Sequence, residues 1–293
     1  MNLALTVLQI TAPVFILAAV GFSWVKMGFE YRVEFVTRLA MTLAVPCLIF
    51  VALMRTKIEP EALAALSLAT ISGYAMISVI AITMVKIMRL NVRTHLAPLI
   101  FGNTGNLGLP LALFAFGETG LGYAVVVFAV MAVISFTLGI WIVSGGGSLA
   151  KVVKEPLVGA TLLGGLFLWQ GWETPVFLTN ALKMIGDMAI PMMLITLGVA
   201  VGRLHTRDIG KAMIMAVIKI AIGVGAGIVA GRWFGLGPVA FGVLIVQLAT
   251  PVAVTSYLLA EKYGADAQSV AGLVVVSTLM SVVSLPLILA FVI

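Results

Sequence analysis

The chain has 293 residues, of which 62% are hydrophobic and 10% are charged, and its formal net charge is +6. Soluble proteins average about 45–50% apolar and about 25% charged residues, so this chain has too few charges to cover a water-exposed surface. The composition argues against a soluble enzyme, a nucleic-acid-binding protein and a disordered scaffold. It predicts an all-α polytopic membrane protein.

The basic balance and the lone cysteine fit the same class. Basic loops that face anionic lipid and the cytoplasm explain the positive charge better than nucleic-acid binding does. Cys47 is the only cysteine and lies in an apolar run, so neither a disulfide framework nor a cysteine-based metal site is predicted. The segment Met1–Leu3 lacks the positive charge that begins a cleaved signal peptide. The first apolar stretch is therefore interpreted as a retained helix.

Charged residues punctuate the chain at intervals of about 20 residues, the length of a helix that crosses the hydrocarbon core. Ten membrane-spanning helices are therefore predicted, with short loops and no room for a soluble domain. The fifth apolar stretch carries three glycines, Gly145–Gly147, which are interpreted as the exit from its helix. The ten apolar stretches are 3–25, 39–54, 62–85, 96–117, 119–150, 156–172, 180–202, 210–231, 233–260 and 267–293.

The basic residues are distributed unevenly between the two sides of these helices. Loops after odd-numbered helices hold twelve of the 17 Lys and Arg residues, the opposite side holds four, and Lys219 lies within a helix. The positive-inside rule places the richer side in the cytoplasm and both termini on the other side.

The two halves of the chain resemble each other in the placement of proline and glycine. The pattern Pro-x7-Gly-x6-Gly-aromatic begins at Pro13 and again at Pro156, while Pro46 and Pro191 each end an Ala-aliphatic-Pro triplet. The offsets are 143 and 145 residues. Since five helices per half is an odd number, the second half must enter the membrane from the opposite side, as in many secondary transporters. The predicted organisation is two inverted five-helix repeats and a short cytoplasmic linker, at residues 1–144, 156–293 and 145–155.

The fourth helix contains a segment that cannot be regular. From Gly102 to Pro110 the chain holds three glycines, two asparagines and one proline. Proline removes a backbone donor and clashes with the preceding turn, and glycine lowers the cost of unwinding. Irregular backbone at this depth is tolerated only within protein or beside a water-filled cavity. The corresponding stretch, Gln247–Ser256, is the most polar part of the ninth helix.

Unwinding at this depth would expose helix N-termini, which attract anions, and carbonyls, which can ligate a cation. The alternative is a packing kink, which we favour for Pro251 taken alone. For the cluster from Asn103 to Pro110 we favour a binding site, because unpaired amides in lipid are costly. The candidate substrate-binding residues at the two breaks are Asn103, Thr104, Gly105, Asn106, Gln247, Thr250 and Ser256.

Two ionisable residues fall inside predicted helices, Lys219 in the eighth and Asp187 in the seventh. An intramembrane charge is a functional candidate by default. Lys219 is predicted to hold an anionic substrate or to stand in for a coupling cation, unless it snorkels to the cytoplasmic interface. Asp187 is a candidate for proton coupling, with a helix-start residue near the outer interface as the alternative.

The sequence offers no sign of enzymatic chemistry. It lacks the Gly-x-x-x-x-Gly-Lys-Ser/Thr phosphate loop and any Ser/His/Asp arrangement for hydrolysis. His95 and His205 lie beside basic loop residues, where a metal-ligand role is not expected. We predict that the protein is not an enzyme and that it needs no metal and no cofactor.

Three segments resemble the auxin efflux carrier family of bacteria and plants. Gly102–Leu111 is similar to its fourth-helix motif, Ala44–Phe50 to its second helix, and Ala189–Leu194 to its seventh, and Lys219 matches a lysine that bacterial members often have in the eighth helix. The resemblance implies ten helices in two inverted repeats. It also implies that helices 4 and 9 are broken and cross at their prolines, which assigns the crossover to Gly108, Pro110 and Pro251. Pro46 and Pro191 would then break two scaffold helices.

The same resemblance implies the mechanism and the partners. Helices 1, 2, 6 and 7 would form a scaffold, dimeric through helices 2 and 7, and helices 3–5 and 8–10 a mobile transport domain. Substrates of the family are organic anions, such as indole-acetic acid, malate or malonate. We therefore predict a secondary carrier of a small carboxylate that works by an elevator motion in the bacterial inner membrane, surrounded by lipid. The alternatives are a sodium-coupled carrier resembling bile acid symporters, a channel and a ligand sensor.

Overall fold

The computed structural model describes residues 3–55, 59–145, 156–203 and 209–293. Within these ranges every regular element is a helix. Seven helical stretches of the described residues are long and apolar enough to cross a membrane by length and composition. The structure thus confirms an all-helical membrane protein. The predicted linker at 145–155 lies, apart from Gly145, outside the described residues.

The described residues of the first half form seven α-helices and three π-helical turns. The π-helical turns are η1 (Ala40–Ala44), η2 (Thr104–Gly108) and η3 (Ser135–Gly139). The α-helices are α1 (Leu3–Lys26), α2 (Val33–Leu39), α3 (Val45–Arg55), α4 (Pro60–Ile87), α5 (Val92–Ile100), α6 (Leu109–Ile134) and α7 (Ile140–Ser144).

Two glycines mark ends of helical stretches in this half. Gly117 has φ 65° and ψ −159° inside α6, so α6 consists of two helical stretches joined at a kink. Gly145 follows α7 with φ 75°, the left-handed conformation in which glycine commonly ends a helix. The kink separates the predicted fourth and fifth helices, and Gly145 lies at the predicted exit of the fifth.

The second half contains seven described helices. They are α8 (Pro156–Gln170), α9 (Val176–Asp187), α10 (Ala189–Arg203), α11 (Ile209–Trp233), α12 (Pro238–Leu248), α13 (Val254–Lys262) and α14 (Ala267–Val292).

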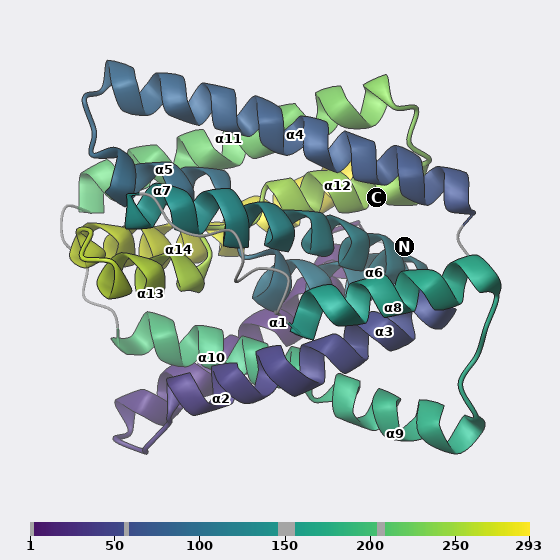
Figure 1. Cartoon of the computed structure of the whole chain (residues 1–293). Helices are drawn as coiled ribbons and strands as arrows, with labels where there is room; N and C mark the ends of the chain where they lie inside the picture. Colours follow the sequence, from purple (N-terminus) through teal and green to yellow (C-terminus); the bar gives the residue numbers. More distant parts are fainter. Residues whose placement is uncertain (1–2, 56–58, 146–155, 204–208) are drawn as a thin grey trace.

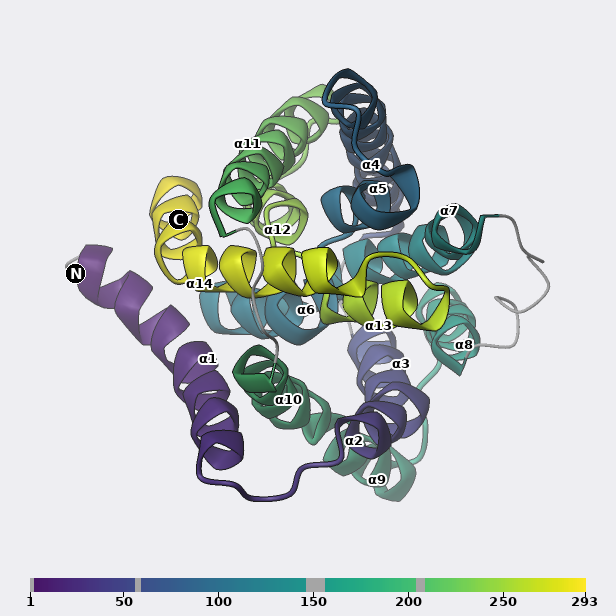
Figure 2. The ribbon, with the colours of Figure 1, turned by 90° about the vertical axis from the view of Figure 1, so that its left-hand side faces the viewer.

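The helices pack in two groups that lie one above the other in Figure 2. In the lower group α1 packs along α10, and α3 packs against both α8 and α9. In the upper group α11 contacts α4, α12 and α14, and α12 contacts α6. Figure 1 shows α4 and α11 running side by side, away from α9 and α10. The groups meet where α1 and α3 contact α6 and where α10 contacts η2.

Small residues allow the closest helix approach in the lower group. A Cβ added at Gly198 in α10 would overlap the carbonyl oxygen of Ala18 in α1, and one at Gly21 would overlap that of Ile195. Close packing through small residues is the usual way in which helices associate in lipid. These glycines therefore explain why α1 and α10 lie together along their length.

Hydrogen bonds connect several loops that the charge pattern assigns to one side of the membrane. The Arg93 guanidinium donates to the carbonyl of Tyr263 at 2.7 Å, and Asp266 N–H donates to Thr94 Oγ1 at 3.3 Å. Arg203 donates to the carbonyl of Tyr31 at 2.7 Å. The basic residues at these loops thus fix neighbouring segments to one another at one end of the helix bundle.

Candidate functional site

Two interrupted helices meet at the centre of the upper group. Helix α5 ends at Ile100 and α12 ends at Leu248, and each is followed by a short non-helical segment before the chain becomes helical again. Gly102 and Val252 form an isolated antiparallel bridge, in which Asn103 N–H donates to the carbonyl of Pro251 at 2.7 Å. We call this junction, residues 101–103 and 249–253, the crossing.

The crossing satisfies peptide groups that the helices leave open. Val252 N–H donates to Ser277 Oγ of α14 at 3.1 Å, and the carbonyl of Asn103 accepts from the N–H groups of Leu107 and Gly108. Proline 251 has no N–H to satisfy. Unpaired backbone groups are costly where no water reaches them, so these contacts make a non-helical backbone possible here.

Glycines allow the two segments to approach each other closely. A Cβ at Gly102 would overlap Thr250 Oγ1, and one at Gly108 would overlap Gln247 Oε1. Thr250 Oγ1 donates to the carbonyl of Gln247 at 2.7 Å, and Gln247 Nε2 reaches the carbonyl of Ala124 at 3.5 Å. Thr250 and Gln247 therefore pack the crossing together.

Two helix N-termini begin beside a small cavity next to the crossing. Asn103 is the N-cap of η2, which continues into α6, and Ala253 is the N-cap of α13. The cavity has a volume of about 70 Å³. It is lined by Met41, Gly102, Asn103, Gly105, Asn106, Phe128, Met131, Ala132, Ser135, Ala253 and Thr255.

Several polar side-chain atoms near this cavity are buried without a partner. Within the described part of the chain, no hydrogen bond reaches Asn103 Nδ2, Thr104 Oγ1 or Gln247 Oε1. Buried polar atoms normally have a partner, and each exception calls for an explanation such as a bound molecule. Asn103 lines the cavity, and its side-chain amide keeps an unused N–H₂ donor.

The opposite side of the crossing presents carbonyl groups. The Lys219 ammonium in α11 donates to the carbonyl of Leu99, in the last turn of α5, at 3.2 Å. A Cβ at Gly223, one turn further along α11, would overlap the carbonyl oxygen of Leu248 at the end of α12. Lys219 is 3% exposed and does not line the small cavity.

The structure brings together part of the set that the sequence predicts. Asn103, Gly105 and Asn106 line the small cavity. Thr104, Gln247, Thr250, Ser256 and Lys219 are buried around the crossing but are not lining residues. Thr255, Ser135 and Met41 line the cavity and were not among the candidates; Thr255 and Ser135 are polar residues within apolar helices, which is a weak signal.

The crossing lies earlier in the fourth segment than Gly108 and Pro110. Gly108 ends η2, and Pro110 lies in the first turn of α6. Because η2 continues into α6, Pro110 lies inside a continuous helical stretch, directly after the π-helical turn. Pro251 does lie at the crossing, where its carbonyl accepts from Asn103.

The two predicted scaffold breaks coincide with irregular helix geometry. Pro46 follows the π-helical turn η1 at the start of α3, and Pro191 lies in the first turn of α10, just after α9 ends at Asp187. Asp187 is therefore a helix-end residue and not a helix-start residue. Its carboxylate accepts from Lys183 Nζ at 3.0 Å on both oxygens, and its side chain is 57% exposed.

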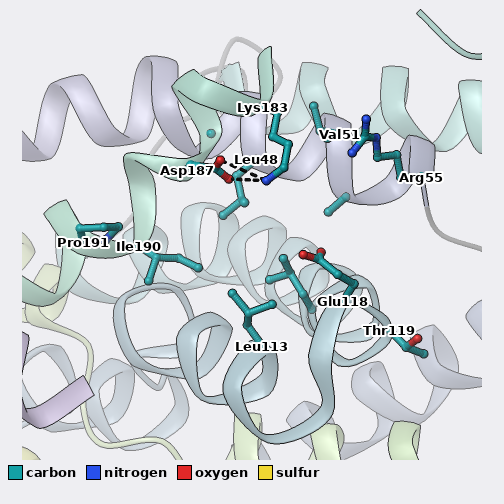
Figure 3. Close-up of a pocket in the computed structure, with 13 residues that line it drawn as sticks. Leu48, Val51, Arg55, Leu113, Glu118, Thr119, Lys183, Asp187, Ile190 and Pro191 are labelled. Carbon is teal, nitrogen blue, oxygen red and sulfur yellow. Dashed lines mark hydrogen bonds and ion pairs between the residues drawn. The ribbon is translucent and has the colours of Figure 1, made fainter. Parts of the chain in front are cut away.

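Asp187 also lines a second, larger cavity of about 530 Å³ between the two helix groups (Figure 3). Arg55, Lys183 and Asp187 lie on the walls formed by α3 and α9, and Glu118 points toward the cavity from α6. Neither Arg55 nor Glu118 forms an ion pair with another described residue. We call this space the charged vestibule.

Comparison with known proteins identifies the kind of protein to which this architecture belongs. A family model described as a membrane transport protein matches residues 6–152 and 144–289. The chain belongs to this family. The match confirms the resemblance to the auxin efflux carriers, which are part of it. The family consists of membrane transporters and not of enzymes.

Two similar proteins come from archaea. An uncharacterized transporter of Methanothermobacter thermautotrophicus is 30% identical over 194 residues, which are 63% of each chain. An uncharacterized transporter of Methanocaldococcus jannaschii is 23% identical over 199 residues, 64% of each chain. The matched stretch thus spans less than two thirds of these relatives, whose names add no substrate.

Proposed function

We propose that this membrane transporter is a secondary carrier of a small organic anion, with the small cavity beside the crossing as its binding site. The observation that carries the proposal is the pair of helix N-termini, at Asn103–Thr104 and Ala253–Val254, that begin at the cavity. Each N-terminus carries a partial positive charge and unpaired N–H groups, which together favour an anion. Asn103 Nδ2 adds a side-chain donor that is otherwise unused within the described residues.

The size of the cavity suggests which part of the substrate it holds. A volume of about 70 Å³ is several times the roughly 10–15 Å³ that one water molecule needs. In this conformation it accommodates a carboxylate group but not a whole auxin-sized molecule. The rest of the substrate would extend between η1, which contributes Met41, and the crossing.

The helix arrangement supports an inverted-repeat carrier with ten spans. In this proposal α5 with the first stretch of α6, and α12 with α13, are the broken fourth and ninth spans. The lower helix group, α1–α3 and α8–α10, is the scaffold, and the upper group is the transport domain. A site built on the upper group and faced by Met41 of the scaffold suits an elevator motion, because sliding one group past the other exposes the site to each side in turn.

The charged vestibule fits the same mechanism. Its walls come from both groups: Arg55 and Lys183 on α3 and α9, and Glu118 on α6. A space between two bodies that slide past each other would change shape during transport. We propose that the vestibule is the outer access route, with Asp187 at its edge instead of in a proton path.

The setting of the protein is proposed on the same basis. The basic loops would face the cytoplasm, with both termini outside, in the bacterial inner membrane or a corresponding plasma membrane. Helix α9 exposes Val176, Phe177 and Met184, and this apolar face would contact lipid or a second copy, in a homodimer through the second and seventh spans.

Thermal-shift titration of the purified protein with a panel of carboxylates, followed by uptake into proteoliposomes, tests the proposal. We expect at least one carboxylate to raise the unfolding temperature and to be taken up with saturation. Asn103→Ala should abolish uptake and leave the fold intact, because the hydrogen bonds of Asn103 to the crossing come from its backbone. Unsaturable conductance would favour a channel, and tight binding without flux would favour a sensor.

A further inference from the structure

Helix α11 places one buried lysine against the carbonyl side of the crossing. Lys219 is 3% exposed, and its Nζ donates to the carbonyl of Leu99 at 3.2 Å. No carboxylate among the described residues forms an ion pair with it. An isolated ammonium inside a membrane protein is costly and is usually kept for a function. The buried position of Nζ excludes the interpretation that Lys219 snorkels to the interface, since a snorkelling side chain ends in water.

The same face of α11 contacts the ends of both interrupted helices. Lys219 reaches the last turn of α5, and Gly223, one helical turn on, lies so close to the end of α12 that an added Cβ would be 3.1 Å from Ala249 Cα. Gly223 thus lets α11 approach the last carbonyl of α12, that of Leu248. The carbonyl ends of α5 and α12 therefore converge on one patch of α11.

The charge of the lysine matches the charge of these two helix ends. The last carbonyls of a helix have no partner within it and give the C-terminus about half a negative charge. Two such ends amount to about one negative charge, which a single univalent cation balances. Unwound carbonyls and helix C-termini at the centre of a transporter are also the groups that coordinate a coupling cation. Lys219 occupies this position with a covalently attached cation.

We propose that the Lys219 ammonium is a built-in counter-cation that replaces a bound alkali cation at the carbonyl side of the crossing, so that the carrier works without sodium. The crossing then separates two roles. Its N–H side, with Asn103, holds the anion, and its carbonyl side, with Lys219, needs no inorganic ion. This inference rests on the carrier function proposed above and assigns Lys219 as a positioning residue, not as a ligand of the substrate.

The test compares Lys219→Ala, which leaves space and no charge, with Lys219→Met, which fills the space without charge. Lys211→Ala is the matched control, because Lys211 lies in the same helix and is exposed. Unfolding temperatures are measured in sodium, lithium, potassium and choline chloride at equal ionic strength. The carboxylate-induced shift is measured in each salt, and methylammonium chloride is added as a small replacement for the lost side chain.

For the wild type and Lys211→Ala we expect equal unfolding temperatures in sodium and choline. Lys219→Ala should acquire a cation dependence, with the unfolding temperature rising by about 3–6 °C for each tenfold increase of sodium or lithium. Its carboxylate-induced shift should be weak in choline and should return with the alkali cation or methylammonium. Lys219→Met should show neither the stabilisation by alkali cations nor the recovery of the carboxylate-induced shift.

Four results would overturn the proposal. Sodium stabilisation of the wild type, or sodium-stimulated uptake by it, would mean that a cation site exists beside the lysine. Carboxylate binding by Lys219→Ala that is lost in every salt, or unchanged in every salt, would mean that the lysine contacts the anion or is irrelevant to it. If Lys219→Ala does not fold, a sodium dependence of the wild type can still overturn the proposal. If no carboxylate shifts the wild type, the anion proposal fails, but the cation dependence of Lys219→Ala remains measurable.

Discussion

Gly102→Ala tests whether the crossing is held together by close contact between its two segments. The added methyl group would overlap Thr250 Oγ1 and would lie 3.2 Å from the carbonyl oxygen of Thr250. The hydroxyl cannot rotate away freely, because it donates to the carbonyl of Gln247 at 2.7 Å. We therefore expect the substitution to push the segments apart and to weaken the hydrogen bond from Asn103 to Pro251.

The expected cost follows from these contacts. Overpacking a close-packed interior costs about 1–3 kcal/mol. The added methyl group would meet the backbone of Thr250 as well as its side chain. Thr250→Ala alone removes one hydrogen bond, worth about 1 kcal/mol. In the double variant Gly102→Ala/Thr250→Ala the methyl group meets no hydroxyl. The double variant should therefore be more stable than the sum of the single changes by about 1–2 kcal/mol.

Thermal unfolding of the two single variants and the double variant measures this coupling, and uptake of the substrate found in the carboxylate panel measures its consequence. Gly225→Ala is the control, since a Cβ there would have nothing within 4 Å and alanine favours a helix by about 1 kcal/mol. Strictly additive losses would refute the reasoning, because they would mean that Gly102 and Thr250 do not touch. Wild-type stability of Gly102→Ala would refute it as well.

Two further predictions concern the packing and one loop. Gly198→Ala should prevent folding or lower the unfolding temperature severely, because its Cβ would overlap the backbone of Ala18 and lie 2.9 Å from Phe22 N. Expression level and stability in detergent measure this effect. A stable variant would contradict the packing of α1 on α10. Asp266 caps α14, and hydrogen bonds from Ser269 hold the pKa of its carboxyl below the ordinary value of 3.8. A lowered folded pKa stabilises above pH 3.8, and this contribution disappears as pH falls through the folded value. Asp266→Ala should therefore be less stable than the wild type by about 1 kcal/mol near neutral pH. Unfolding curves measured at several pH values should show this difference disappearing in strong acid. A stability difference that persists in strong acid would exclude the carboxylate charge as the cause.

The helices could be predicted from the sequence because the bilayer limits both their length and their composition. Stretches of about 20 apolar residues between charges identify helices well, since a charge inside lipid is costly. The π-helical turns, such as Ala40–Ala44, carry no comparable signal. Two of them lie just before a proline, η1 before Pro46 and η2 before Pro110, but a proline does not give the bounds of the turn.

The location of the crossing shows where local rules fail. Pro110 favours the prediction because proline removes a hydrogen bond, but the helix continues from η2 through Pro110 into α6. The break falls at Gly102 instead, because only there does Thr250 come close enough to require glycine. A contact across some 150 residues of sequence is not visible in either segment alone.

For the two ionisable residues within predicted helices, the sequence again predicts only part of what the structure shows. Burial of Lys219 follows from its position in an apolar helix, and the structure adds its partner, the carbonyl of Leu99. Asp187 is also an ionisable residue within a predicted helix, yet it lies at the end of α9, paired with Lys183 and 57% exposed. A break between α9 and α10 brings Asp187 to the edge of the charged vestibule, and such a break is difficult to locate from composition.

The two sides of the crossing explain each other. Breaking two antiparallel helices at the same depth produces two N-terminal ends and two C-terminal ends at one place, and each pair carries about one unit of partial charge. An anion at the Asn103 side needs the opposite pair to be balanced, otherwise the carbonyl ends of α5 and α12 would repel it. In our proposal Lys219, which donates to the carbonyl of Leu99, supplies that balance from within the chain. In the proposed carrier, the anion site and the buried lysine are therefore consequences of the same break, and a carrier that lost the lysine would need an ion from solution to replace it.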